Sequence, residues 1–115
     1  MTNLLIVLLS FLPTYTIEIR NPPIRSELVV VTGYSSEVGQ TDDSPEITAS
    51  QKRVRVGFIA CPRKLKFGTI VEIEGKEYVC EDRMHGRFDN RYDIWFPSTV
   101  EAREWGIKTL EVKIK

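Results

Sequence analysis

Two aspartates and the only histidine of the chain lie close together in its second half. Asp82 follows the apolar residues Tyr78-Val79-Cys80, and Asp93 lies inside the apolar run Tyr92–Phe96. His85 and a glycine occupy the polar loop between them. A carboxylate in an apolar strand costs free energy unless it is paired or protonated. This stretch is therefore the first candidate for a functional site.

The hydrophobic pattern predicts that strands position these residues. Period-two alternation and β-branched residues recur through the second half of the chain, and Glu74-Gly75-Lys76 is typical of a hairpin loop. One helix is predicted from Thr99 to Trp105. Ser98 can cap it, Glu101 completes a capping box, and Gly106 ends it. The expected strands are Glu27 to Tyr34, Arg53 to Cys61, Gly68 to Ile73, Glu77 to Glu81, Arg91 to Phe96 and Leu110 to Ile114.

The composition is that of one globular domain. A chain of 115 residues supports a single modest core, and six or seven short strands with one helix predict a mainly β barrel. The 16 basic and 16 acidic side chains give a net charge of zero and are interspersed, so nothing indicates nucleic acid or an anionic membrane as a partner. We expect a monomer.

The N-terminal region differs from the rest. Residues 1–16 carry no charged side chain, and the apolar run Leu4 to Leu12 is too short to span a bilayer but suits a secretory signal. No basic residue precedes the run and no clear cleavage site follows it, so a hydrophobic first strand or tucked segment is the alternative. Residues 17–25, with successive prolines, are expected to form a linker, and residues 26–115 the domain.

Several short motifs occur in an order typical of one bacterial family. They are Thr48-Ala49-Ser50, Val56–Pro62, Phe67–Ile73, Glu81-Asp82, Arg91-Tyr92-Asp93 and Ser98–Gly106. Together they resemble bacterial 3D domains, named for three aspartates, over roughly Val31 to the C-terminus. The chain also resembles the catalytic domain of membrane-bound lytic transglycosylase A and, more distantly, RlpA-like and expansin-like proteins. The resemblance implies a six- or seven-stranded double-psi β-barrel that cleaves or binds cell-wall glycan.

The resemblance also implies roles for the two aspartates. Asp93 matches the acid/base that protonates the leaving glycosidic oxygen, and Asp82 matches an orienting or pKa-coupling partner. In this mechanism the muramyl 6-hydroxyl attacks its own anomeric carbon, so one carboxyl group serves both steps. From the residues alone, Asp82 could equally be a turn residue paired with Arg83 or Arg91, and Asp93 an ordinary strand-edge residue.

Four further residues are candidates for contact with the glycan. Tyr34 and Thr48 match the tyrosine of a Thr-x-Tyr motif and the threonine of Thr-Ala-Ser-Gly in the family. His85 could hydrogen-bond sugar, although a lone loop histidine is more often solvated. Strand alternation places Trp95 on the same face as Asp93, where it could stack on a sugar, or it could be largely buried core. Tyr34 could likewise be a core aromatic with its hydroxyl at the surface.

Two departures from the family pattern favour a binding function over catalysis. Cys61 stands where the family has its first aspartate. The Asp-Thr-Gly-Gly loop has become Asp82–Gly86, which loses a glycine pair that would let sugar approach the backbone. A catalytically inactive glycan-binding module is therefore the second expectation.

The two cysteines leave several possibilities open. In an exported protein, Cys61 and Cys80 would form a disulfide, because the resemblance places them near one another; in the cytosol they would be small buried hydrophobes. A metal site with Asp82 and His85 does not follow a recognised zinc spacing, and a Cys61 nucleophile with His85 as base has no support from the resemblance. We expect no metal and no cofactor.

The sequence thus predicts an exported protein of the cell envelope or medium, or a phage-encoded lytic protein, that cleaves the glycan strands of peptidoglycan. A groove with the Asp93 carboxyl at its floor and Asp82 within hydrogen-bonding distance would favour the enzyme. Asp93 locked into an arginine pair would favour the binding module.

Overall fold

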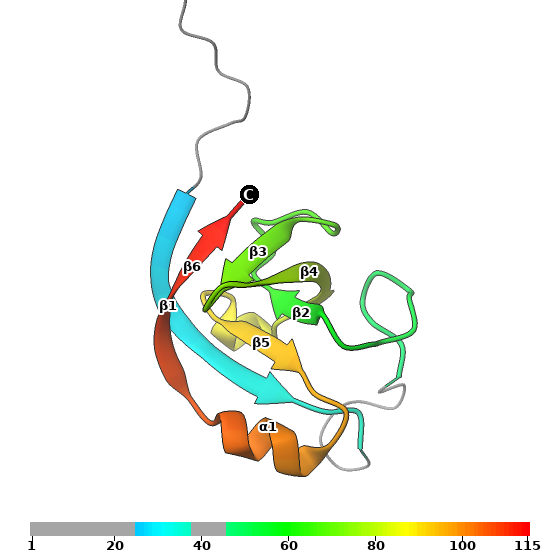
Figure 1. The fold of residues 1–115 in the computed structure, drawn as a ribbon. Coiled ribbons are helices and arrows are strands. Elements are labelled where there is room, and N and C mark those ends of the chain that lie inside the picture. The colour runs from blue at the N-terminus through cyan, green and yellow to red at the C-terminus, as the bar shows by residue number, and fades with distance from the viewer. Residues whose placement is uncertain (1–24, 38–45) are drawn as a thin grey trace, which may run out of the picture.

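The computed structural model describes residues 25–37 and 46–115 (Figure 1). The predicted N-terminal segment and most of the predicted linker lie outside the described residues. Arg25, which the sequence assigned to the linker, is the first residue of a strand.

Six strands close into a barrel in the order β1-β5-β2-β4-β3-β6. The pairs β1–β5 and β2–β4 are parallel, and the other four are antiparallel. This confirms the predicted mainly β barrel with one short helix. The elements are β1 (Arg25–Tyr34), β2 (Phe58–Cys61), β3 (Ile70–Ile73), β4 (Lys76–Arg83), the 3-10 helix η1 (Gly86–Phe88), β5 (Tyr92–Trp95), α1 (Thr99–Trp105) and β6 (Lys108–Ile114).

The predicted strand from Arg53 to Cys61 is too long. Only its last four residues, Phe58–Cys61, belong to β2, while Arg53 forms an isolated bridge with Ile47. Gly57 has a φ of 100°, in the region that favours glycine and that strands do not use. The chain therefore turns at Gly57 before it enters the barrel.

The helix has the predicted bounds. The Ser98 hydroxyl accepts a hydrogen bond from the Glu101 backbone N–H at 3.2 Å, and Gly106 ends the helix with a φ of 75°. The Glu101 carboxylate accepts from the Ser98 hydroxyl at 3.0 Å, so the two side chains of the capping box bond to each other. Figure 1 shows α1 lying beside β1 at one end of the barrel.

The core fills the barrel interior and follows strand alternation. In β5, Tyr92 and Ile94 are buried, whereas Asp93 and Trp95 are only partly so. This confirms the predicted shared face of Asp93 and Trp95, which is turned away from the core. The fully buried core side chains are Val31, Ile59, Cys61, Val71, Ile73, Cys80, Tyr92, Ile94 and Val112.

Gly33→Ala is expected to destabilise the fold. A Cβ at Gly33 would lie 2.8 Å from Phe96 Cε2 and 3.1 Å from the Ala102 carbonyl oxygen, so the contact between β1 and α1 would have to open. Overpacking of this kind costs about 1–3 kcal/mol. The measurement is the free energy of unfolding in urea. Gly86→Ala is the matched control, because its Cβ would meet nothing closer than 4.0 Å, and equal losses in both variants would contradict the prediction.

Candidate functional site

A β-bulge in β4 determines where Asp82 points. Ile59 of β2 pairs with Cys80, but the next residue, Ala60, pairs with Asp82, so Glu81 is an extra residue in the ladder. Regular alternation would place Asp82 on the same face as Cys80, in the core. The bulge instead turns Asp82 to the face of Ala60.

The strand register then aligns both aspartates in one row. Ala60 pairs with Asp82 on one side and with Asp93 on the other, and Asp93 pairs with Thr32 of β1. Paired residues project from the same face of a sheet. Asp82, Ala60, Asp93 and Thr32 therefore form a row across four adjacent strands, with the small alanine side chain between the two carboxyl groups.

Three hydrogen bonds hold the Asp82 carboxylate in place. Its Oδ2 accepts from the Tyr34 hydroxyl at 2.8 Å, and its Oδ1 accepts from the backbone N–H groups of Ala49 and Arg83 at 2.9 Å each. Burial, reinforced by the charge of Asp82, raises the pKa of Tyr34, so this hydroxyl stays a donor. Within the described chain, Asp82 forms no ion pair with Arg83 or Arg91, which does not favour the turn-residue interpretation.

Asp93 has a carboxyl oxygen without a partner. Its Oδ1 is buried, and no described group hydrogen-bonds to it. Burial raises the pKa of Asp93 to about 6; a hydrogen bond from the Thr32 hydroxyl opposes this, and the negative charge of Asp82 adds to it. Among residues 25–37 and 46–115, no arginine pairs with Asp93 and no hydrogen bond joins it to Asp82. The aspartates are thus coupled through charge.

Thr48 lies near the site but uses its hydroxyl within its own turn. The hydroxyl bonds to Ser50 Oγ at 2.9 Å and accepts from the Lys52 N–H at 3.2 Å. Two hydrogen bonds attach this turn to the bulge. The Ala49 N–H donates to the Asp82 carboxylate, and the Ser50 N–H donates to the Glu81 carbonyl oxygen at 3.2 Å. Thr48 therefore shapes the wall next to Asp82.

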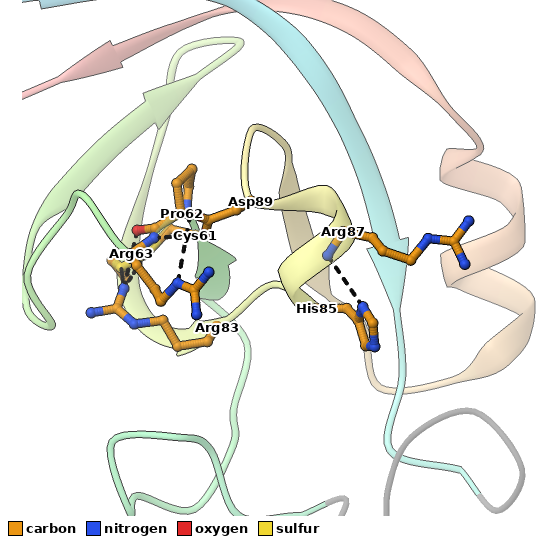
Figure 2. A network of polar contacts seen from close by, with 8 residues as sticks. Cys61, Pro62, Arg63, Arg83, His85, Arg87 and Asp89 are labelled. Atoms are coloured by element: carbon orange, nitrogen blue, oxygen red, sulfur yellow. Dashed lines mark hydrogen bonds and ion pairs between the residues drawn. A yellow bond between two sulfur atoms is a disulfide. The ribbon is translucent and has the colours of Figure 1, made fainter.

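Neither His85 nor Trp95 hydrogen-bonds to Asp82 or Asp93 in the described chain. His85 is exposed and caps η1, where its Nδ1 accepts from the Arg87 N–H at 3.3 Å (Figure 2). The Trp95 indole N–H donates to Ser36 Oγ at 2.8 Å. Its ring borders a hollow of about 380 Å³ that neither aspartate lines. Other residues around this hollow include Val56, Tyr78, Phe96 and Pro97.

Cys61 and Cys80 form a disulfide with a Cα–Cα distance of 5.8 Å. Neither thiol remains free for a nucleophile or a metal. In the part of the chain that the structure describes, no group of three or more His, Cys, Asp or Glu side chains could hold a metal ion. The bond lies beside the bulge, because Cys61 follows Ala60 and Cys80 precedes Glu81.

The sequence prediction missed the roles of Ala60 and Glu81. Glu81 is only 3% exposed, and its Oε2 accepts from Lys52 Nζ at 3.0 Å, so this charge pair fastens the neighbouring turn. No local signal marks Glu81 as a bulge, because it continues a pattern that a regular strand would also show.

Comparison of the chain with protein-family models and with curated proteins finds no match. Among the described helices, none has the length and apolar character needed to cross a membrane.

Proposed function

We propose that this protein cleaves peptidoglycan glycan strands as a lytic transglycosylase, with Asp93 as the single acid/base. The observation that carries the proposal is the buried, unpartnered Asp93 Oδ1, set one small residue away from the fixed carboxylate of Asp82. A general acid must hold its proton near the working pH, and burial of the Asp93 carboxyl group favours the protonated form. The resemblance of the ordered motifs to 3D domains supports peptidoglycan as the substrate.

The reaction then needs one carboxyl group. Protonated Asp93 gives its proton to the glycosidic oxygen as the bond to the anomeric carbon breaks. The muramyl 6-hydroxyl bonds to that carbon and returns its proton to Asp93, which leaves a 1,6-anhydro end and restores the acid. Asp82 raises the pKa of Asp93 and adds negative charge where positive charge develops on the ring.

One observation favours a glycan-binding module as the second candidate. Cys61, at the position of the family's first aspartate, is buried and bonded to Cys80, so no carboxylate is supplied there. The experiment that separates the two is mass analysis of soluble products after the purified chain is incubated with peptidoglycan. Products ending in 1,6-anhydro-muramic acid support the proposal. Reducing ends would indicate a hydrolase, and retention on insoluble wall material without products would indicate the binding module.

The rate of cleavage is expected to fall as the pH rises through about 6. Burial raises the pKa of Asp93 to about 6, and only the protonated group can serve as the acid. Asp82→Asn should move this fall in rate to lower pH, because the substitution removes a negative charge that raises the pKa of Asp93. The asparagine keeps an amide oxygen that can still accept hydrogen bonds. The measurement is kcat/KM on soluble glycan from pH 4 to 9. A rate that keeps rising above pH 8 would contradict the assignment.

A further inference from the structure

The guanidinium group of Arg83, the last residue of β4, is held in place beside Cys61 and Pro62. Its Nη1 donates to the Pro62 carbonyl oxygen at 3.2 Å and lies 3.3 Å from Cys61 Sγ. The group also lies over the Phe67 ring, 4.0 Å from the ring centre. The hydrogen bond from Nη1 and the packing on Phe67 fix the orientation of the guanidinium plane. The N–H groups on Nε and Nη2 then form a rigid pair of parallel donors.

This positive charge has no carboxylate partner. No Asp or Glu among the described residues pairs with the Arg83 guanidinium. The Asp82 oxygens accept instead from the Tyr34 hydroxyl and from the backbone N–H groups of Ala49 and Arg83. A cation that is partly removed from water is costly without a counter-charge. An oriented but unpaired arginine therefore points to an anion that binds from outside the chain.

Arg63 contributes a second guanidinium group on the same side of η1. Figure 2 shows Arg63 and Arg83 on one side of η1, while Arg87 extends to the other side. Arg63 has 69% of its side chain exposed, and its Nε lies 3.7 Å from Asp89 Oδ2. The Arg63 guanidinium therefore has one long contact with a carboxylate, whereas the Arg83 guanidinium has none among the described residues.

We propose that Arg83, assisted by Arg63, binds a carboxylate of the peptide stem carried by the glycan substrate. The inference rests on the proposed function and names what the enzyme recognises beside the sugars. The sugar backbone of the glycan has no charged group, whereas its stem peptides carry free carboxylates. A planar carboxylate matches the two parallel N–H donors of an arginine fork.

The test uses intact glycan strands and the same strands with the stem carboxyl groups converted to uncharged amides, because removal of the stems by an amidase would free the lactyl carboxylate of muramic acid. The wild-type chain is expected to prefer the strands with free stem carboxylates in kcat/KM by about tenfold or more, the size of a charge-assisted bond. Arg83→Gln and Arg63→Gln should reduce this ratio towards one. Arg87→Gln is the matched control, because it removes an exposed arginine on the other side of η1, and it should keep the wild-type ratio. A ratio near one for the wild-type chain, or the same ratio in all four proteins, would overturn the inference.

Binding measured by calorimetry keeps this test separate from catalysis. A soluble stem peptide should bind the wild-type chain and the Arg87→Gln variant, and should bind Arg63→Gln more weakly. The last substitution is at an exposed side chain that does not support the barrel. Binding in an inactive wild-type chain would support the inference although the proposed enzyme had failed. Binding of a soluble polyglycerol phosphate but not of the stem peptide would overturn it, because the anion would then be a phosphate.

Discussion

Asp93→Asn is expected to abolish glycan cleavage and, at pH 7, to stabilise the fold. Loss of a general acid costs about 10²–10⁴-fold in rate. Burial raises the pKa of Asp93 from 3.8 to about 6. The folded state therefore binds the proton more tightly than the unfolded state, and the ionised group destabilises the fold at neutral pH.

The size and pH range of this effect follow from the same two pKa values. The difference of about two between 3.8 and about 6 corresponds to about 3 kcal/mol, at about 1.4 kcal/mol for each tenfold change in proton affinity. The destabilisation is absent below pH 3.8, grows as the pH rises to about 6, and is complete above that. The Asp93→Asn variant should not show this destabilisation, because asparagine cannot ionise.

Urea unfolding of the wild-type chain and of Asp93→Asn at pH 4 and pH 7.5 measures this prediction, with product analysis on the same samples. The variant should gain about 1–3 kcal/mol at pH 7.5 and almost nothing at pH 4. Glu104→Gln is a suitable control, because Glu104 is an exposed carboxylate on α1 that belongs to neither proposed site. Full activity in Asp93→Asn would reject Asp93 as the acid, and a loss of stability at pH 7.5 would show that its carboxylate is paired.

Removal of the disulfide is expected to have the second large effect. Cys61 and Cys80 are separated by 19 positions, and a cross-link closing a loop of this length stabilises a fold by about 3 kcal/mol. The disulfide also joins residues on either side of the bulge, and it is the bulge that keeps Asp82 opposite Ala60. Reduction should therefore lower both the stability and the rate of cleavage.

The measurement is the urea midpoint with and without dithiothreitol, together with the initial rate on glycan. The double variant Cys61→Ala, Cys80→Ala controls for direct effects of the reductant, since its midpoint should not respond to dithiothreitol. If mass analysis finds two free thiols and the midpoint is unchanged, the disulfide does not stabilise this fold.

Local sequence features predicted the parts of the molecule that depend on neighbouring residues. The bounds of α1 follow from Ser98, Glu101 and Gly106, because a cap and a stop act within one turn. The shared face of Asp93 and Trp95 follows from the two-residue period of an undistorted strand. The mainly β character of the fold likewise follows from alternation and turn residues along the chain.

Predictions from strand alternation were wrong where pairing with a distant strand changed the local backbone geometry. β2 begins at Phe58 because Gly57 turns the chain, and Asp82 leaves the core face because Glu81 is bulged against β2. A bulge depends on how a partner strand pairs, and that partner lies some twenty positions away in the chain. The pattern of one strand cannot contain this information.

The sequence by itself determined a small, mainly β domain with Asp93 and Trp95 on one face of a strand and a capped helix after it. Only the tertiary structure decided that Asp82 and Asp93 flank Ala60, that Tyr34 donates to Asp82, and that Asp93 keeps an unpartnered oxygen. The physical reason is that burial and charge at a carboxyl group depend on groups brought from distant strands, whereas caps and alternation depend on residues a few positions away.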